Sequence, residues 1–415
     1  MFDKKTIDDV DVTGKTVLMR VDYNLPQNDA GEVTDTLRIR ESLGTIRSLF
    51  DKGAAKVVLM AHLGRPDGEW KEKYTLLPVF EKLAEMVDGA VFEGRNLESE
   101  TEAIRERIDG LERGSVVLLE NIRFYGAEEL KGKTDEERER RLEWARRIVA
   151  ATGAEVFVCD CFGVAHRDHV SISGMNEVLP GVAGLLVKSE VEKITGVMRD
   201  PKRPLLAIIG GAKISDKIGV MKRLVELADV IVVGGAMANT FLRYKGVMVG
   251  RSVVEEGQDE VIREVLELAE NLGKRVILPS DVVVGELRAD SWSEVRGIDR
   301  VGAEEMILDV GPMTRGEVVE LLQSVKTVIW NGTLGMTEYA QFAEGSREVM
   351  RAILANKELV TVIGGGDTGG FAEEYKKAHG EEFTGSNLHI STGGGASLEL
   401  IEGKSLPGVE ALQGR

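Results

Sequence analysis

The sequence is poor in cysteine and in long apolar runs. Two cysteines in 415 residues are typical of a protein from a reducing compartment, where disulfides are rare. No apolar run reaches the roughly 18 residues that a membrane-spanning helix needs. The first residues, Met1-Phe2-Asp3-Lys4-Lys5, lead into polar sequence without the apolar core of a signal peptide. We therefore expect a cytoplasmic protein that has no membrane partner.

Basic residues are also scarce relative to acidic ones, and the formal net charge is −17. Such a charge repels a phosphate backbone, so we expect no nucleic-acid partner. It leaves room for a local basic cleft that binds a small anion, and a cleft of that kind would stand out against an acidic surface.

The length and the order of apolar runs predict two α/β domains. A chain of 415 residues is too long for one ordinary domain. Short apolar runs alternate with helical patterns in both halves, which predicts mainly parallel sheets covered by helices. A helical pattern over residues 183–198 is bounded by proline and glycine on both sides, and it predicts a hinge helix between the two domains. The expected fold class is therefore two doubly wound, Rossmann-like α/β domains that face a cleft, with the boundary between residues 182 and 183.

In the first half, basic residues follow the apolar runs. The runs cover residues 15–21, 56–60, 115–119 and 155–158. In an open parallel sheet, ligands bind beyond the carboxyl ends of the strands. Arginine or histidine at several successive strand ends predicts a basic crescent for a small, multiply charged anion such as a phosphorylated carboxylate. The members of this crescent are Arg20, Arg38, His62, Arg65, Arg123, His166 and Arg167.

In the second half, glycines follow the apolar runs. The most informative stretch is the β-branched run 359–363, which leads into Gly364-Gly365-Gly366-Asp367-Thr368-Gly369-Gly370. Glycines let the backbone approach a ligand, and the first turn of the helix expected from Phe371 would point its free N–H groups at an anion. Because a carboxylate repels a bare phosphate, Asp367 is expected to hold a Mg²⁺ ion that the phosphates of a nucleotide share.

A dinucleotide is the weaker alternative for this loop. Gly364, Gly366 and Gly369 have the spacing of the dinucleotide fingerprint. That fingerprint also needs an acidic residue at the end of the next strand to hold a ribose. The next strand ends in Ile390-Ser391-Thr392, without an acid, which disfavours NAD. A non-enzymatic nucleotide-binding regulator is a second alternative, but it would not need the basic crescent.

Eight blocks of sequence occur in a recognisable order along the chain: Arg20-Val21-Asp22-Tyr23-Asn24, His62-Leu63-Gly64-Arg65-Pro66, Glu120-Asn121-Ile122-Arg123-Phe124, Phe162-Gly163-Val164-Ala165-His166-Arg167, Gly210-Gly211-Ala212-Lys213, Trp330-Asn331-Gly332-Thr333-Leu334-Gly335, residues 364–368 and residues 391–400. On these blocks the chain closely resembles phosphoglycerate kinases from end to end. Tyr23 stands where the family usually has phenylalanine, and Asp168 where it often has a small residue.

The resemblance implies a reversible, Mg²⁺-dependent kinase of glycolysis and gluconeogenesis. It implies phosphoryl transfer between 1,3-bisphosphoglycerate plus ADP and 3-phosphoglycerate plus ATP. Residues 1–182 would form the phosphoglycerate-binding domain, residues 183–399 the nucleotide-binding domain, and residues 400–415 would return to the first. The implied phosphoglycerate contacts are Asp22, Tyr23, Asn24, Arg38, His62, Leu63, Gly64, Arg65, Arg123, His166 and Arg167. The implied nucleotide contacts are Gly211, Lys213, Lys217, Gly235, Asn331, Glu338, Gly364, Gly365, Gly366, Asp367 and Thr368, with Asp367 on the metal.

The chemistry of this reaction is consistent with the residues at hand. The nucleophile in the direction from ATP is a carboxylate, which is ionised at neutral pH and needs no general base. Catalysis then depends on positioning and on stabilising the charge of the transferring phosphoryl group, which we assign to Lys213 and Arg38. Because water must be excluded during transfer, we expect closure about the hinge helix of a monomeric enzyme.

Overall fold

The computed structural model of the protein describes residues 2–415, and the chain forms two compact units. The first unit extends to Glu192 and includes Ser405–Arg415, and the second is Lys193–Lys404. The division falls ten residues after the expected boundary, inside helix α5 (Leu185–Arg199). This helix covers most of the predicted hinge segment, and both units contain part of it.

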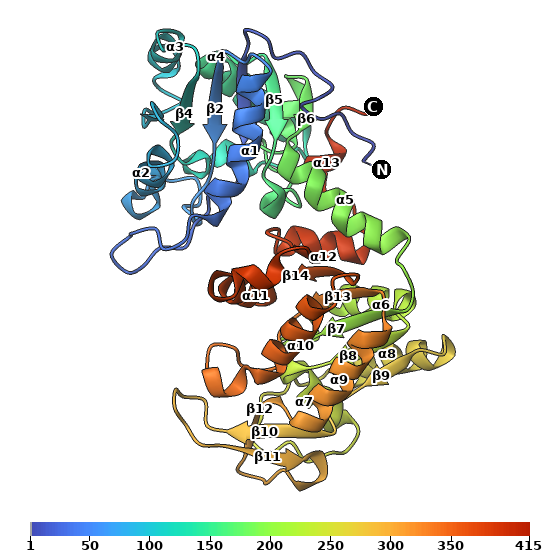
Figure 1. The fold of residues 1–415 in the computed structure, drawn as a ribbon. Coiled ribbons are helices and arrows are strands. Elements are labelled where there is room, and N and C mark those ends of the chain that lie inside the picture. The colour runs from blue at the N-terminus through green and yellow to red at the C-terminus, as the bar shows by residue number, and fades with distance from the viewer. Residues whose placement is uncertain (1) are drawn as a thin grey trace. The chain divides into compact units, whose positions relative to one another are not determined.

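The first unit contains one six-stranded parallel sheet (Figure 1). Neighbouring strands pair in the order β3-β4-β2-β1-β5-β6. Strand β1 lies between β2 and β5, and Val17 pairs with both Val57 and Val156. The strands are β1 (Thr16–Arg20), β2 (Lys56–Met60), β3 (Val91–Glu93), β4 (Ser115–Leu119), β5 (Val156–Cys159) and β6 (Gly181–Ala183).

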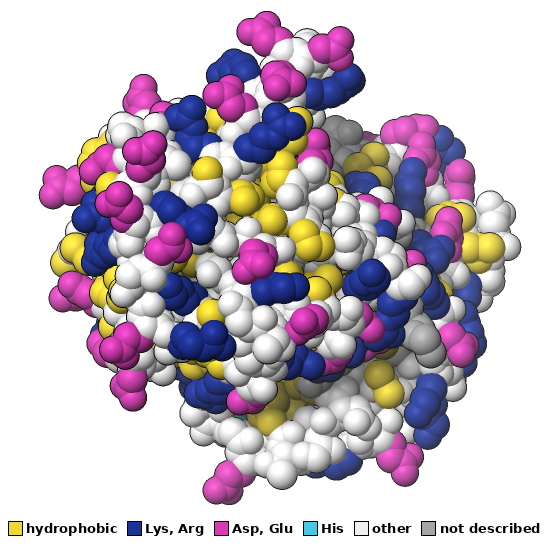
Figure 2. All heavy atoms as spheres, turned by 90° about the horizontal axis from the view of Figure 1, so that it is seen from above, with side chains coloured by type: hydrophobic (Ala, Val, Ile, Leu, Met, Phe, Trp, Pro, Cys, Tyr) yellow, Lys and Arg dark blue, Asp and Glu magenta, His cyan; other side chains and the backbone are white. Residues whose placement is uncertain are grey.

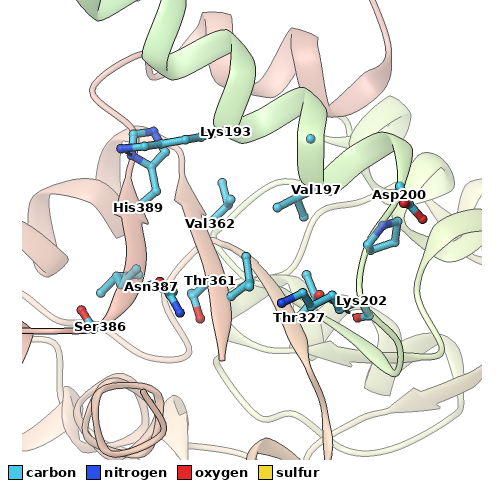
Figure 3. Close-up of a pocket in the computed structure, with 14 residues that line it drawn as sticks. Lys193, Val197, Asp200, Lys202, Thr327, Thr361, Val362, Ser386, Asn387 and His389 are labelled. Atoms are coloured by element: carbon cyan, nitrogen blue, oxygen red, sulfur yellow. Dashed lines mark hydrogen bonds between the residues drawn. The ribbon is translucent and has the colours of Figure 1, made fainter. Parts of the chain in front are cut away.

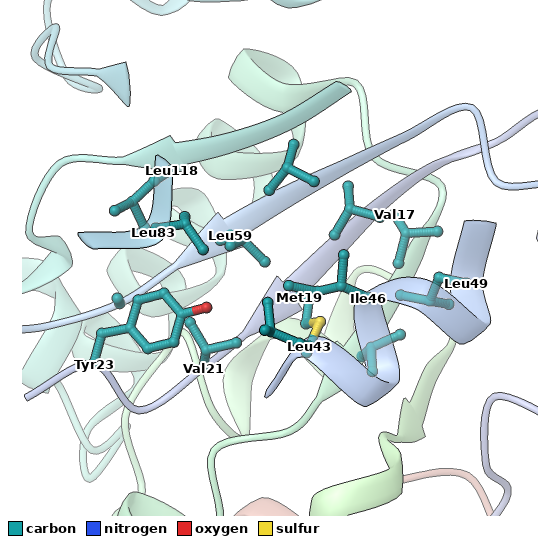
Figure 4. Close-up of a cluster of buried hydrophobic side chains, with 14 of the residues drawn as sticks. Val17, Met19, Val21, Tyr23, Leu43, Ile46, Leu49, Leu59, Leu83 and Leu118 are labelled. Atoms are coloured by element: carbon teal, nitrogen blue, oxygen red, sulfur yellow. The ribbon is translucent and has the colours of Figure 1, made fainter. Parts of the chain in front are cut away.

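Helices cover this sheet and complete its core. Alternate residues of β1 pack against α1, with Val17 and Met19 in contact with the cluster that contains Leu43 and Ile46 (Figure 4). The highly charged helix α4 begins after the capping residue Thr134, whose side chain accepts from the backbone N–H of Glu137. The helices of this unit are α1 (Leu37–Asp51), α2 (Leu77–Ala84), α3 (Thr101–Asp109), α4 (Asp135–Thr152), the start of α5, and α13 (Pro407–Glu410).

The C-terminal segment packs into the first unit. Leu406 and Val409 are buried, and the backbone N–H of Gly408 donates to the carbonyl of Ala165 at 2.9 Å. The backbone N–H of Lys5 donates to the carbonyl of Gln413 at 2.7 Å. The two ends of the chain therefore lie in the same unit.

The second unit contains a second parallel sheet of six strands, in the order β15-β14-β13-β7-β8-β9 (Figure 1). The two sheets confirm the expected α/β fold class with two mainly parallel sheets. The strands are β7 (Leu205–Ile209), β8 (Val230–Val233), β9 (Arg275–Ile277), β13 (Thr327–Asn331), β14 (Val360–Gly364) and β15 (Asn387–Ile390). The helices are the end of α5, α6 (Ile218–Leu227), α7 (Gly235–Tyr244), α8 (Asp259–Asn271), α9 (Pro312–Ser324), α10 (Glu344–Ala355), α11 (Gly366–Ala378) and α12 (Gly395–Glu402).

The second unit also contains a three-stranded antiparallel sheet that the sequence analysis does not predict. Its strands are β10 (Asp281–Gly285), β11 (Ser293–Gly297) and β12 (Met306–Val310), in the order β11-β10-β12. Strand β11 is largely exposed and polar, so it lacks the apolar run by which the other strands are recognised.

The surface is highly charged, and acidic and basic side chains are intermingled on the face that Figure 2 shows. Among the described residues, no helix is both long and apolar enough to span a bilayer.

Candidate functional site

In each unit, the strand order reverses at the central strands. Strand β1 continues to β2 on one side, and β5 joins it on the other; in the second unit, β8 and β13 flank β7 in the same way. Loops diverge at such a reversal and leave a crevice beyond the carboxyl ends of the strands. The predicted site residues that follow β1 and β5 share one of these edges, and those that follow β7, β8 and β13 share the other.

At the edge of the first sheet, Asp22 and Asn24 hold Arg38. The guanidinium Nη1 of Arg38 lies 3.2 Å from Asp22 Oδ2 and donates to the carbonyl of Asn24 at 2.8 Å. The side-chain oxygen of Asn24 accepts from the backbone N–H of Gly64 at 2.8 Å. These contacts join the loop after β1, the loop after β2 and the first turn of α1, which are far apart in sequence.

The same edge contains buried nitrogen atoms that lack hydrogen-bond partners. Among the described residues, no group accepts from Arg123 Nη2 or Arg167 Nε, and His166 Nδ1 is also unpartnered. Burial and the neighbouring charges of Arg20 and Arg167 lower the pKa of Arg123 to about 10. Unpaired buried donors are unfavourable unless a partner satisfies them. An anion with several oxygen atoms is the partner that this arrangement accommodates.

The remaining predicted residues of this edge have different environments. Arg65 is exposed, and His62 is buried, with 2% exposure. The side chains of Tyr23 and Leu63 belong to the core, and the Tyr23 hydroxyl lies 2.7 Å from Ser42 Oγ. Any ligand contact of these two residues would therefore come from their backbone.

Asp168 is paired with Arg141 on α4. Arg141 Nη2 lies 2.7 Å from Asp168 Oδ1 and donates to Ser173 Oγ at 2.7 Å. The departure from the family's residue at position 168 therefore has a counter-charge of its own, and the positive charge of the neighbouring Arg167 is preserved.

In the second unit, the glycine-rich strand ends line a cavity of about 240 Å³. Part of the lining comes from the loops after β7, β8 and β13, and includes Gly211, Gly235 and Leu334. Another part comes from the antiparallel sheet, through Val282 and Leu308. Glu338 and Asp367 are among the acidic residues of the lining. A mainly apolar slot that also contains carboxylates and glycine loops suits a flat aromatic base joined to a sugar phosphate.

The loop after β14 turns through Gly365. Its φ of 94° and ψ of 151° are accessible only to glycine at low energy, and a Cβ there would lie 2.6 Å from Asn331 Nδ2. The turn lets α11 begin at Gly366, not near Phe371 as expected. Asp367 and Thr368 consequently lie in the first helical turn, where free N–H groups favour an anion.

Two further contacts hold this loop against the end of β13. Asn331 Nδ2 donates to the carbonyl of Gly364 at 2.8 Å, and Thr368 Oγ1 accepts from the backbone N–H of Gly332. Asn331 Oδ1 is buried and has no partner among the described residues.

Two lysines extend from the loop after β7. Lys217 Nζ donates to the carbonyl of Gly210 at 2.9 Å. Burial lowers the pKa of Lys217 to about 8, against the opposing effect of Asp367 and Asp216. Lys213 is exposed, so its ammonium group is accessible to a ligand.

Glu255 is a residue of this site that the sequence analysis missed. Its carboxylate accepts from the backbone N–H groups of Ile214 at 2.6 Å and Ser215 at 3.1 Å, and so it holds the loop that carries both lysines. Glu255 lies some forty residues further along in a polar stretch without a recognisable pattern, and only the tertiary contact identifies it. The apolar wall of the cavity was missed together with its antiparallel sheet, although the run Val282-Val283-Val284 offered a signal for one strand.

A second cavity, of about 560 Å³, contains none of the predicted residues. It lies where the end of α5 passes the starts of β13, β14 and β15, and Lys193 and His389 meet at one end of it (Figure 3). The two nitrogen atoms Lys193 Nζ and His389 Nδ1 are 3.5 Å apart.

The residues present are compatible with a nucleotide-bound Mg²⁺ ion. Among residues 2–415, no cluster of three or more histidine, cysteine or acidic side chains could hold a metal by itself. Asp367 contributes one exposed carboxylate beside the glycine loop. Mg²⁺ is commonly bound by one or two carboxylates together with phosphate oxygens and water, so a single carboxylate is sufficient when the phosphates supply the other ligands.

The fold and these two edges define a class of protein: a two-unit α/β protein with buried, unpartnered nitrogens at the sheet edge of one unit and a glycine-lined cavity in the other. Comparison with known proteins identifies the family. The family model for phosphoglycerate kinase matches residues 7–404. The chain belongs to the phosphoglycerate kinase family.

Relatives of known activity match over nearly the full length. The phosphoglycerate kinases of Dictyoglomus turgidum and Moorella thermoacetica are each 42% identical over 414 residues, which is 99% of this chain and 99% of theirs. The solved structure of phosphoglycerate kinase from Coxiella burnetii is 30% identical and superimposes with a TM-score of 0.82 over 98% of both chains. The enzyme from Pyrococcus horikoshii is 29% identical, with the same TM-score and coverage.

This family membership confirms the expected activity. The chain is a phosphotransferase with a carboxyl group as acceptor, and its reaction is the reversible glycolytic transfer between 1,3-bisphosphoglycerate plus ADP and 3-phosphoglycerate plus ATP.

Proposed function

We propose that the first unit binds the phosphoglycerate at the carboxyl edge of its sheet and the second unit binds the nucleotide in its cavity. The observation that carries the assignment is the set of unpartnered buried nitrogens of Arg123, His166 and Arg167. A phosphate or carboxylate would satisfy them with charge-assisted hydrogen bonds. Arg38 and Asn24 are held beside them by the Asp22 ion pair and the Gly64 contact.

The nucleotide assignment depends on the cavity and on the loop after β14. The base occupies the apolar slot between Leu334 and the antiparallel sheet, and Glu338 accepts from a ribose hydroxyl. The phosphates lie against the first turn of α11, near Lys217. Asp367 would hold the Mg²⁺ ion, which when bound would neutralise part of the phosphate charge.

Catalysis by this chain is a matter of placement and charge. The acceptor carboxylate needs no base, so the protein's task is to orient it and to keep water away from the transferring group. Arg38 and Lys213 stabilise the charge on the equatorial oxygens of that group during an in-line transfer. Because the two substrates bind to different units, the units must approach for transfer, and α5 is the segment about which they close. The enzyme acts in the cytoplasm as a monomer.

The test combines a turnover assay with a substitution of Arg123, one of the residues whose buried nitrogens lack partners. Purified enzyme should consume ATP with millimolar Mg²⁺ only when 3-phosphoglycerate is present, and a coupled step should remove the acyl phosphate. Arg123→Gln should raise the KM for 3-phosphoglycerate about tenfold or more, as expected for a lost charge-assisted hydrogen bond, with little change in the KM for ATP. Arg105→Gln removes an arginine that is paired with Asp109 on α3 and serves as the control. A larger effect of Arg123→Gln on ATP than on phosphoglycerate would mean that the substrates are assigned to the wrong units.

A further inference from the structure

A chain of hydrogen bonds connects a buried carboxylate to His62. Glu128, Ser171 and Arg20 are each 0% exposed and come from three separate segments of the first unit. Ser171 Oγ lies 2.5 Å from Glu128 Oε1. Arg20 Nε lies 2.9 Å from Ser171 Oγ, and Arg20 Nη2 lies 3.2 Å from His62 Nδ1. Arg20 is the last residue of β1, directly behind the edge where we place the phosphoglycerate.

The direction of every hydrogen bond in this chain is determined by the guanidinium group, which can only donate. Ser171 Oγ therefore accepts from Arg20, and its own proton points to Glu128. The second carboxylate oxygen of Glu128 accepts from the backbone N–H of Ser171 at 3.1 Å. At the other end, Arg20 donates to His62 Nδ1, so this nitrogen carries no proton.

The guanidinium group has little freedom to turn away from His62. Its Nη1 donates to the backbone carbonyls of Val21 and Met60, which hold its plane. A competing partner for Nδ1 is Asp22 Oδ1, at 4.0 Å, and a proton on Nδ1 would be needed for that contact. The shorter distance to Arg20 selects the opposite arrangement.

The imidazole is also kept neutral. Burial and the nearby charges of Arg20, Arg123, Arg38 and Arg167 lower the pKa of His62 well below 6.5. A neutral imidazole without a proton on Nδ1 carries it on Nε2. Within residues 2–415, no hydrogen bond satisfies His62 Nε2, so this N–H is free to donate to a ligand.

We propose that Glu128, Ser171 and Arg20 are positioning residues that hold His62 in the Nε2–H tautomer, so that it donates to an oxygen of the phosphoglycerate. The inference rests on the proposed placement of that substrate. In the other tautomer, Nε2 would present a lone pair to a phosphate or carboxylate oxygen and repel it. Burial raises the pKa of Glu128 to about 7, so above that pH its carboxylate is the counter-charge for Arg20. The Ser171 hydroxyl links the two groups.

The first test determines the tautomer of His62 in the wild-type enzyme. Two-bond proton–nitrogen correlation spectra of ¹⁵N-histidine-labelled enzyme report which ring nitrogen carries the proton. The chain has five histidines, and the spectrum of His62→Gln assigns the signal of His62. We expect a protonated Nε2 and an unprotonated Nδ1 at neutral pH. A proton on Nδ1 would overturn the inference.

The second test removes the carboxylate behind Arg20 and keeps the shape of the side chain. In Glu128→Gln, the amide N–H₂ donates to Ser171 Oγ, which then receives two donors and has no acceptor for its own proton. Arg20 can still only donate, but its guanidinium group is held less firmly beside His62 Nδ1. We therefore expect His62 to populate both tautomers and the KM for 3-phosphoglycerate to rise about tenfold, while kcat and the KM for ATP stay within about twofold. Glu93→Gln is the matched control, because Glu93 is equally buried in the same unit, at 1% exposure, and pairs with Arg95 and Arg107 instead.

A merely structural role for Glu128 would lower thermal stability and leave the tautomer signal and the ratio of the two KM values unchanged, which would refute the proposal. If Glu128→Gln does not fold, Ser171→Ala and Ser171→Thr replace it: only the threonine variant keeps the hydroxyl and should retain the wild-type KM. His62→Gln separates this inference from the substrate assignment. If His62→Gln leaves the KM for 3-phosphoglycerate unchanged, the placement of this substrate beside His62 is wrong. If His62→Gln raises this KM but Glu128→Gln does not, only the positioning role of Glu128, Ser171 and Arg20 is wrong.

Discussion

Substitution of Gly365 by alanine tests how strictly the nucleotide loop depends on its backbone conformation. Gly365 precedes the first turn of α11 with φ 94° and ψ 151°. An added Cβ would lie 2.6 Å from Asn331 Nδ2, the group that ties the loop to β13 through the carbonyl of Gly364. Gly365→Ala therefore introduces an unfavourable dihedral combination and a steric overlap at the same point.

The structure allows the size of this effect to be estimated. A non-glycine residue in such a conformation costs about 1–3 kcal/mol, and an overlap with a packed side chain adds about 1–3 kcal/mol before the chain relaxes. With partial relaxation we expect a loss of about 3 kcal/mol in the free energy of unfolding. For a unit of about 150–250 residues, such as Lys193–Lys404, this corresponds to a decrease in Tm of roughly 6–12 °C.

The relaxation itself should affect activity. A shift of the turn moves Asp367 and Thr368, which lie in the first turn of α11. Because misplacement by about 1 Å can cost up to about 100-fold in rate, we expect kcat/KM for MgATP to fall by about ten- to a hundredfold, with the KM for 3-phosphoglycerate nearly unchanged.

Calorimetry and steady-state kinetics on Gly365→Ala and Gly385→Ala provide the comparison. Gly385 also has a positive φ, of 72°, but a Cβ there would meet nothing within 4 Å. The control should therefore lose about 1 kcal/mol from its backbone conformation and keep its activity. Equal Tm values and equal kinetics for the two variants would refute the argument that the contact with Asn331 determines the loop.

Four further predictions concern the two substrate edges. Lys213→Ala should lower kcat by roughly 10²–10⁴-fold, as for other charge-stabilising groups, with an unchanged unfolding transition; a near-normal kcat would remove Lys213 from the mechanism. Arg65→Ala should raise the KM for 3-phosphoglycerate more than that for ATP in initial-rate measurements, and the reverse pattern would mean that the substrates are exchanged. Because the pKa of Lys217 is lowered to about 8, its ammonium group loses its proton and its charge as the pH rises through that value. The KM for MgATP should therefore rise above about pH 8 in the wild type and stay level in Lys217→Arg. Parallel pH profiles of the two enzymes would exclude Lys217 from nucleotide binding. Small-angle scattering should show a smaller radius of gyration with both substrates than with either one, and an unchanged radius would contradict closure about α5.

The local pattern of apolar residues was sufficient to predict most of the parallel strands. The runs 56–60 and 115–119 coincide with β2 and β4, because a strand buried on both faces must be apolar throughout. The ends of these strands carry arginine, histidine or glycine, and the rule that ligands bind at that edge then predicted which residues converge.

The apolar pattern was less successful in predicting where helices begin and where polar strands lie. The helix α11 begins five residues earlier than its apolar pattern suggested, because Gly365 completes the turn and the glycines after it can be helical. The antiparallel sheet was missed, since β11 is exposed and polar and its pairing with β10 comes from contacts that no local pattern encodes.

By itself, the sequence determined the fold class, the family and the chemical character of each half, because buried strands, glycine turns and basic strand ends are local properties. The tertiary structure alone decided which buried groups are left without partners and how the others are connected. It pairs Asp168 with Arg141, places Tyr23 in the core, and ties Glu255 to the lysine loop. The chain from Glu128 to His62 is of the same kind: hydrogen bonding acts over about 3 Å in space, and its partners here are separated by as many as 151 residues in sequence.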